Sequence, residues 1–216
     1  MRILIRGFGE LCITAGLILL LFVTYELWGT GQYTEKQQDE LGNQLSRDWN
    51  NVTTERVRLG RGMALLRIPR FGDTYRYVVI EGVGAEDLRK GPGHYPGTAL
   101  PGQLGNFVVS GHRTTYSAPF NRVDELRPGD RILVDTRTEQ LVYSVTGQRI
   151  VAPSEISVTA PVPFHPKRAA AKRLLTLTTC HPKFSAAKRL IIFGELTQRR
   201  PRTTSPGTPS SAFGGI

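Results

Sequence analysis

Between residues 61 and 198 the chain is a series of short runs rich in Val, Ile, Leu and Tyr, and this pattern constrains the fold most strongly. Short apolar runs bounded by turn residues are typical of β-strands. The runs are Met63–Ile68, Tyr75–Glu81, Asn106–Ser110, Arg131–Asp135, Leu141–Val151, Leu174–Thr179 and Arg189–Leu196. Only short helices are expected between them, at Gly84–Lys90 and around Phe120–Leu126. Seven or eight short strands at this spacing predict an all-β domain, either an antiparallel barrel or a sandwich.

Residues 1–28 predict a membrane segment. Leu11–Tyr25 carries no charged residue, and Arg2 and Arg6 precede it. The apolar region from Phe8 to Trp28 is long enough to cross a bilayer, and the leading arginines favour a cytoplasmic N-terminus. A cleaved signal peptide is the alternative, with the small-x-small triplet Gly29-Thr30-Gly31 as a weak cleavage site. Both interpretations place the rest of the chain outside the cytoplasm.

The segments on either side of the strand-rich domain are polar. Residues 29–60 are expected to form an extracellular stalk or linker that packs loosely, with a helix around Glu35–Trp49, where Leu41, Leu45 and Trp49 recur every four residues. Residues 199–216 are rich in Pro, Ser, Thr and Gly and predict a disordered basic tail. The expected domain therefore spans residues 61–198.

Charge and cysteine content exclude several classes of protein. The chain has 28 Lys and Arg against 18 Asp and Glu, a net charge of +10, but no block of five or six consecutive like charges and no pattern of stacking aromatics that would indicate nucleic-acid binding. A basic exported domain is compatible with an anionic cell envelope. Two cysteines, Cys12 and Cys180, are too few for a disulfide framework or a multi-cysteine zinc module. The histidines show no tight metal-ligand spacing, so neither a metal nor another cofactor is expected.

Cys180 is the cysteine outside the membrane segment, and it ends the apolar run Leu174–Thr179. A thiol at a strand end, partly exposed and near a group that favours thiolate, is a candidate nucleophile. A buried and inert thiol is the alternative, since free cysteine is among the most buried residue types.

Two further residues are candidates for the same chemistry. His112 follows the strand Asn106–Ser110 and has the side chain best suited to act as acid and base near neutral pH, although it could also be a histidine with a structural partner. Arg189 opens the strand after Cys180, so in a hairpin its guanidinium could reach a developing oxyanion, although it could also be a surface arginine.

These residues resemble the motifs of a known family. Thr176-Leu177-Thr178-Thr179-Cys180 is similar to the TLxTC signature of sortases, Arg189 opens the next strand as the family arginine does, and Gly111-His112-Arg113 resembles the sortase histidine motif. The strings at residues 91–98, 105–107 and 178–182 resemble those of class E sortases, the housekeeping-type enzymes of actinobacteria. The resemblance covers about residues 61–198.

The resemblance implies a closed eight-stranded β-barrel on the outer face of the membrane and a cysteine transpeptidase that needs no cofactor. Cys180 would cleave a C-terminal sorting signal of surface proteins, LAxTG or LPxTG, between Thr and Gly through a thioester. His112 would protonate the departing amine and later deprotonate the incoming amine of a lipid-linked peptidoglycan precursor, and Arg189 would stabilise the oxyanion. Tyr95 and Thr179 would contribute to substrate binding.

Three alternatives accompany this expectation. The chain could be an extracytoplasmic cysteine peptidase that mainly hydrolyses, a pilin-polymerising sortase, or an envelope-binding module without activity. The pilin-polymerising class carries an Asp-Pro lid motif, and residues 1–216 contain no Asp-Pro pair. A housekeeping anchoring role is therefore favoured.

Overall fold

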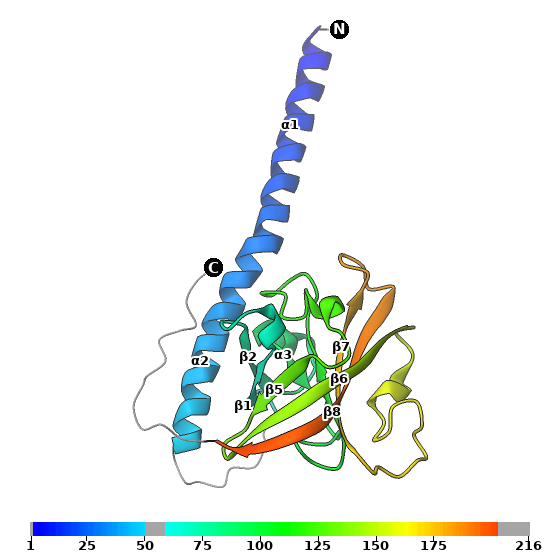
Figure 1. Cartoon of the computed structure of the whole chain (residues 1–216). Helices are drawn as coiled ribbons and strands as arrows, with labels where there is room; N and C mark the ends of the chain where they lie inside the picture. Colours follow the sequence, from blue (N-terminus) through cyan, green and yellow to red (C-terminus); the bar gives the residue numbers. More distant parts are fainter. Residues whose placement is uncertain (1, 51–58, 203–216) are drawn as a thin grey trace.

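The computed structural model describes residues 2–50 and 59–202, and the side chains of residues 2–4, 27 and 28 lie outside that description. A long N-terminal helix stands beside a β-barrel (Figure 1). The strands are β1 (Gly62–Arg67), β2 (Arg76–Glu81), β3 (Gly93–His94), β4 (Gly105–Ser110), β5 (Arg131–Asp135), β6 (Glu139–Val151), β7 (Arg173–His181) and β8 (Lys188–Pro201). The helices and helical turns are α1 (Arg2–Thr24), η1 (Tyr25–Gly29), α2 (Thr30–Asn50), η2 (Pro69–Phe71), α3 (Ala85–Lys90), η3 (Val123–Glu125) and η4 (Ile156–Thr159).

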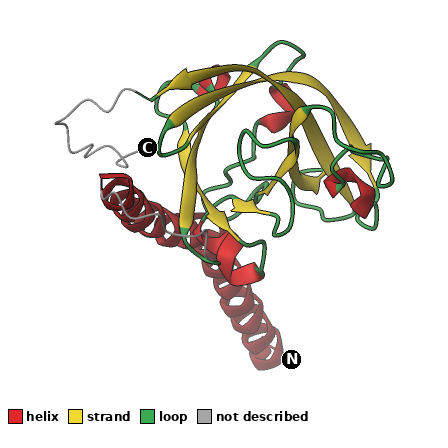
Figure 2. Ribbon diagram, turned by 90° about the horizontal axis from the view of Figure 1, so that it is seen from below, coloured by secondary structure: helices red, strands yellow, loops and turns green. Residues whose placement is uncertain are grey.

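The eight strands close into a barrel in the order β1-β2-β3-β4-β7-β8-β6-β5, which confirms the predicted all-β barrel class. The pairs β2–β3 and β4–β7 are parallel, and the other neighbouring pairs are antiparallel. Figure 2 shows the closed ring of strands with the two long helices outside it on one side. A barrel of eight strands is just wide enough for side chains to fill its interior.

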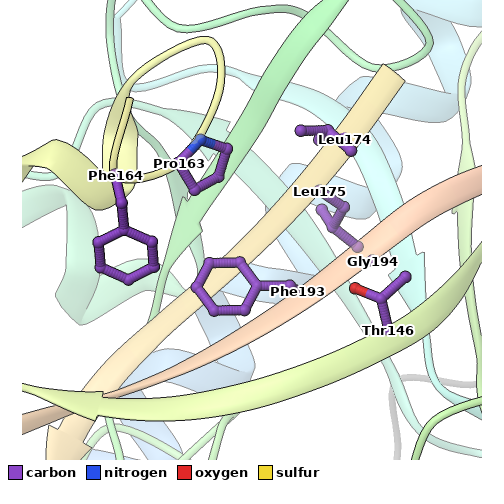
Figure 3. A pocket seen from close by; sticks show the side chains of 7 residues that line it. All are labelled: Thr146, Pro163, Phe164, Leu174, Leu175, Phe193 and Gly194. Carbon is purple, nitrogen blue, oxygen red and sulfur yellow. The ribbon is translucent and has the colours of Figure 1, made fainter. Parts of the chain in front are cut away.

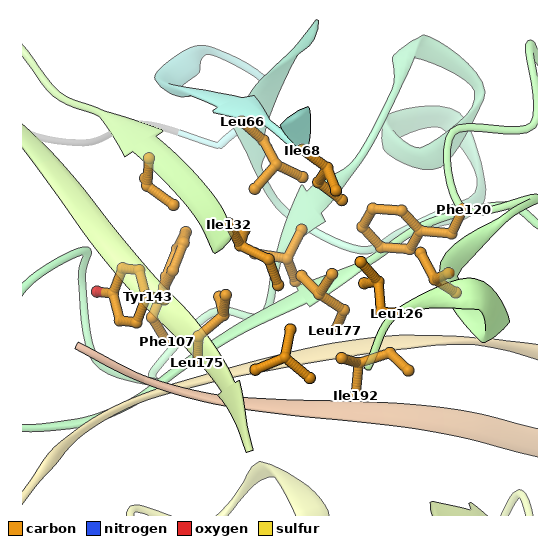
Figure 4. Close-up of a cluster of buried hydrophobic side chains, with 14 of the residues drawn as sticks. Leu66, Ile68, Phe107, Phe120, Leu126, Ile132, Tyr143, Leu175, Leu177 and Ile192 are labelled. Atoms are coloured by element: carbon orange, nitrogen blue, oxygen red, sulfur yellow. The ribbon is translucent and has the colours of Figure 1, made fainter. Parts of the chain in front are cut away.

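That interior is the hydrophobic core. Alternate residues of each strand point inward, as the period of two requires. Phe107, Leu175, Leu177 and Ile192 are buried there together with Tyr143, the largest of the fully buried side chains (Figure 4). The Tyr143 hydroxyl accepts a hydrogen bond from Gly102 N at 2.8 Å, and burial raises its pKa to about 12.

Helix α2 packs against the outer surface of the barrel, so the expectation of a loosely packed stalk is wrong. Leu41 and Leu45 are 6% and 5% exposed and pack on Val78 and Ile80 of β2. Gln38 is buried and hydrogen-bonds both polar groups of the Val78 backbone, since its Nε2 donates to the carbonyl at 3.2 Å and its Oε1 accepts from the N–H at 2.6 Å. The recurrence of leucines every four residues therefore marks a face that the barrel covers.

Helix α1 is apolar and exposed along its length. Residues Ile5–Thr24 are long and apolar enough to cross a membrane, and none of this stretch is buried against the rest of the protein. The π-helical turn η1 joins α1 to α2 without a loop, so the two helices form one rod (Figure 1). An exposed apolar helix of this length is consistent with a membrane anchor.

The C-terminal end of the domain lies beyond the predicted boundary at residue 198. Strand β8 continues to Pro201 because its last residues pair with the beginning of β6, where Glu139 lies opposite Pro201. Arg199 also forms an ion pair with Glu139 at 2.6 Å, so residues 199–201 belong to the barrel and not to the tail. The predicted disorder of residues 203–216 lies outside the described residues.

Candidate active site

Strands β7 and β8 place Cys180 beside Arg189. The two residues are directly opposite each other in the antiparallel ladder, so their side chains lie on the same face of the sheet. Leu175 and Leu177 of β7 point into the core, which puts Cys180 on the outer face. Cys180 is half-buried and forms no disulfide. The hairpin therefore presents a thiol and a guanidinium together at one end of the barrel.

Strand β4 brings His112 to the same end. It runs parallel to β7 with Ser110 paired to Thr178, so the residues that follow each of them leave the sheet side by side. Gly111 N donates to Thr178 O at 3.1 Å, and the Thr179 hydroxyl donates to Gly111 O at 2.7 Å. The N–H and the carbonyl of Gly111, which precedes His112, are thus bonded to Thr178 and Thr179, which precede Cys180.

Glycine is required at position 111 because an aromatic ring packs against its α-carbon. A Cβ added there would lie 2.7 Å from the ring of Phe120. Phe120 N also donates to His112 O at 3.0 Å. The backbone of His112 is therefore fixed both by the sheet and by the loop that follows.

The imidazole of His112 lies in a partly buried pocket with a cation nearby. Its ring centroid is 4.9 Å from that of Tyr116, and the Thr115 hydroxyl is 3.4 Å from its Nδ1. Burial lowers the pKa of His112 below its usual value, and the positive charge of Arg89 lowers it further. Arg89 lies over the Tyr116 ring, with its guanidinium carbon 5.8 Å from the ring centroid. The neutral imidazole is favoured in this environment.

Tyr116 begins a turn in which three successive non-glycine residues adopt left-handed conformations. Tyr116, Ser117 and Ala118 have φ values of 53°, 57° and 41°. This conformation is rare for residues with a side chain and persists only where surrounding contacts hold it. The contacts come from helix α2: Tyr116 N donates to the Thr30 hydroxyl at 3.4 Å, and the Ser117 hydroxyl donates to Gly31 O at 3.0 Å.

Strand β2 and its approach hold the same turn from the barrel side. The Tyr77 hydroxyl donates to Ser117 O at 3.0 Å and the Tyr75 hydroxyl donates to Pro119 O at 2.5 Å. Burial raises the pKa of Tyr77 to about 12 and that of Tyr75 well above its usual range, so both remain donors at neutral pH. The turn beside His112 is therefore held on two sides.

The guanidinium of Arg189 is oriented by its own hairpin. Its Nη1 donates to Ala186 O and to Lys188 O, both at 3.0 Å. Among the hydrogen bonds of the described residues, neither Nε nor Nη2 of Arg189 is a donor. These two groups form the edge of the fork that can bind an oxyanion or a substrate carbonyl.

The two residues expected to bind substrate take different positions. Tyr95 follows β3, its N–H donates to Val108 O at 2.9 Å, and it is 37% exposed. Because the preceding residue, His94, is buried against the core ring of Phe107, Tyr95 points to the outer face that also carries Cys180. Thr179 is 3% exposed and its hydroxyl is bonded to Gly111 O, so it acts on the position of the histidine segment.

Other residues that shape the site were missed from the sequence. Tyr116 and Arg89 contact or face His112 and carry no motif of their own beyond the spacing of Tyr116 four residues after the histidine.

Asn106 is buried on β4, where its Nδ2 donates to Val158 O and Ala160 O at 3.0 Å each, and its Oδ1 accepts from the Thr176 hydroxyl. It thereby anchors the long β6–β7 connection over the outer face of β4 and β7.

An apolar pocket of about 190 Å³ lies under that connection, away from the end of the barrel that carries Cys180. It is lined by Thr146, Pro163, Phe164, Leu174, Leu175, Phe193 and Gly194 (Figure 3). Leu174 precedes Cys180 by six residues, roughly 20 Å along an extended strand. The pocket is therefore separate from the thiol, imidazole and guanidinium. Within residues 2–50 and 59–202, no group of three or more His, Cys, Asp or Glu side chains is arranged to hold a metal ion.

Comparison with known proteins agrees with this geometry. The chain matches the Sortase domain family over residues 66–197. It is 36% identical to sortase SrtE1 of Streptomyces coelicolor over 216 residues, which cover 95% of this chain and 60% of that protein. It is 31% identical to sortase D of Bacillus subtilis over 180 residues, 78% of this chain and 85% of the relative.

Solved structures show the same likeness. Sortase E of Streptomyces avermitilis superposes with a TM-score of 0.61 at 40% identity, covering 67% of this chain and 93% of that one. Sortase E1 of S. coelicolor with a tripeptide in its active site gives 0.62 at 36% identity, covering 70% and 96%. The chain therefore belongs to the sortase family, which confirms the resemblance found in its motifs. Within the family it is similar to class E, although it spans only about 60% of the length of SrtE1.

Proposed function

We propose that this chain is a cysteine transpeptidase that acts on C-terminal sorting signals. The observation that carries the proposal is the register of the barrel, in which Cys180 lies opposite Arg189 and His112 leaves the neighbouring strand at the same end. These three residue types supply a nucleophile, an acid-base group and a fixed cation, which acyl transfer requires.

The reaction begins when the Cys180 thiol gives its proton to the neutral His112 imidazole and the resulting thiolate attacks the carbonyl carbon of the signal's threonine. The carbonyl oxygen becomes an oxyanion, and the Nε and Nη2 groups of Arg189 donate to it. Collapse of this tetrahedral intermediate breaks the Thr–Gly bond. The amine of the departing fragment takes a proton from the His112 imidazolium, and the threonine remains bound to the Cys180 sulfur as a thioester. An incoming amine then gives its proton to His112, attacks the thioester and releases the thiolate.

Substrate recognition is proposed for the outer face of β4 and β7. Tyr95 contacts the second residue of an LAxTG or LPxTG signal, since it lies on this face and is partly exposed. Thr179 is a positioning residue, because its buried hydroxyl holds Gly111. The sortase E1 structure with a tripeptide in its active site supports a peptide substrate for this family member as well.

The proposed setting is the outer face of a cell membrane. Helix α1 anchors the chain, Arg2 and Arg6 keep its N-terminus in the cytoplasm, and the barrel lies outside. The proposed donors are surface proteins that carry sorting signals, and the proposed acceptor is the amino group of a lipid-linked peptidoglycan precursor.

The test uses the full chain with a fluorogenic LAxTG peptide and an LPxTG peptide, with and without triglycine. Cleavage that shifts from the hydrolysed to the triglycine-ligated product supports transfer to an amine. A ratio that stays the same at every triglycine concentration would favour the alternative of a peptidase. Cys180→Ala should abolish cleavage and keep the fold, and full activity in that variant would contradict the proposal. Absence of turnover with both peptides would favour a binding module.

A further inference from the structure

The tip of the β7–β8 hairpin, residues 182–188, exposes an aromatic side chain between two lysines. Phe184 is 81% exposed and adopts a left-handed conformation with φ of 65°, which is unusual for a bulky residue. Lys183 and Lys188 are also exposed, and residues 181–194 contain no Asp or Glu. An exposed aromatic ring flanked by cations is the chemistry that binds the surface of an anionic bilayer.

The position of the tip relative to α1 is fixed by the docking of α2. Thr30 and Gly31 bond to Tyr116 and Ser117, so the loop at the catalytic end of the barrel lies level with the first turn of α2. Thr30 follows the end of the apolar stretch, Thr24, by six residues, about 9 Å along a helix at 1.5 Å per residue. The headgroup region on each side of a bilayer is roughly 5–8 Å thick. The catalytic end of the barrel therefore meets the headgroups when α1 spans the membrane.

The hairpin tip points to the same side. In Figure 1 the orange β7–β8 connection rises from the barrel at the end from which α1 extends, beside the green loop that follows β4. By contrast, η4 lies in the yellow segment lower on the barrel, and its Ile156 is a comparably exposed apolar residue at 75%. Phe184 and Ile156 are thus exposed apolar side chains at different heights on the barrel.

We propose that residues 182–188 are a membrane contact, in which the Phe184 ring enters the interface and Lys183 and Lys188 bind anionic headgroups. The proposal rests on the anchoring role of α1 proposed above. It holds Cys180, two residues before the tip, at the height of the headgroups. It also explains why a phenylalanine at this tip is 81% exposed.

The charges around the tip allow this contact. The Lys183 amine donates to Asn121 at 2.9 Å, and the acidic side chain nearby is Glu125. Glu125 is held by Arg122 through hydrogen bonds of 2.9 and 2.8 Å, so its charge is already balanced. The Lys183 ammonium has three donors and gives one of them to Asn121, and Lys188 is exposed, so both lysines have donors that can reach phosphate groups.

The test places a tryptophan at each height in the full chain. Phe184→Trp and Ile156→Trp are reconstituted in vesicles whose phosphatidylcholine carries brominated acyl chains, with or without phosphatidylglycerol. Bromine quenches nearby indoles, so Phe184→Trp should lose more fluorescence than the unmodified chain and shift its emission to the blue. Ile156→Trp should lose no more fluorescence than the unmodified chain. Equal quenching in Phe184→Trp and the unmodified chain would overturn the proposal.

Three controls separate this inference from the function and the anchor. Lys183→Gln together with Lys188→Gln should remove the extra quenching that phosphatidylglycerol causes, and an unchanged lipid dependence would contradict the role of the lysines. Retention of the unmodified chain in vesicles after alkaline carbonate washing tests the anchor alone, and its release would overturn both. Phe184→Ser should keep the KM for a water-soluble sorting peptide, because a ring that contacts lipid does not bind that peptide. A raised KM in Phe184→Ser, together with no extra quenching in Phe184→Trp, would mean that the ring binds substrate and not lipid.

Discussion

The bond between Thr179 and Gly111 makes a quantitative prediction about how the histidine is held. Thr179→Val keeps the shape of a buried side chain and removes the hydroxyl that donates to Gly111 O at 2.7 Å. Leaving a buried carbonyl without its donor costs about 1–3 kcal/mol of folding stability. The carbonyl precedes His112, so its relaxation also moves the imidazole. A displacement on the order of 1 Å in a reacting group lowers kcat by up to about 100-fold.

Thr176→Val is the matched control. Thr176 lies on the same strand, is fully buried, and donates its hydroxyl to Asn106 at 2.8 Å. The same substitution should therefore cost a similar amount of stability, about 1–3 kcal/mol, without touching the segment before His112. Denaturant unfolding measures the cost in both variants, and kcat against pH measures the position of the histidine.

The expected result is similar destabilisation in both variants and a fall in kcat, with a changed pH profile, in Thr179→Val alone. Thr179→Val with the kcat and pH profile of the unmodified chain would refute the positioning role. An equal change of the pH profile in Thr176→Val would show that general loosening of the strand is responsible.

Two further predictions concern Arg89 and Leu45. Arg89→Gln should raise the pKa of His112 toward its usual value, because the positive charge of Arg89 is one of the two causes that lower it. Titration of the imidazole by NMR measures this shift. The control Arg137→Gln, at an exposed turn, should leave the pKa of His112 unchanged. Since the unfolded chain holds that proton more tightly than the native state does, stability should fall as the pH drops below about 6.5, and less steeply in Arg89→Gln. Leu45→Ala should lower the free energy of unfolding by about 2–5 kcal/mol, whereas the exposed Leu104→Ala should change it by less than about 0.5 kcal/mol; equal effects would mean that α2 does not pack on the barrel.

Local patterns predicted most of the barrel because each long strand is an apolar run bounded by turn residues. The pattern missed β3, since Gly93–His94 has only two residues and no apolar run. It also ended β8 too early, because Arg199–Pro201 are polar and are held as a strand only by pairing with β6. Pairing between segments far apart in the chain is not visible in local sequence.

The same distinction applies to the site. The motifs around His112, Cys180 and Arg189 are local and were found from the sequence, whereas their common position at one barrel end required the β4–β7 and β7–β8 registers. The environment of His112 was not predictable, since Arg89 and the first turn of α2 reach it from other parts of the fold. The leucines of α2 predicted a helix, but the surface that covers them belongs to β2.

The central claim is that the Cys180 sulfur carries the substrate as a thioester. Mixing the full chain with a sorting peptide, quenching in acid within a single turnover and digesting for mass spectrometry measures this directly. The account predicts that the peptide containing Cys180 gains the mass of the substrate fragment ending at its threonine, and that triglycine or hydroxylamine removes it. Product formation with Cys180 unmodified at every time point, or with the adduct on another residue, would contradict the account.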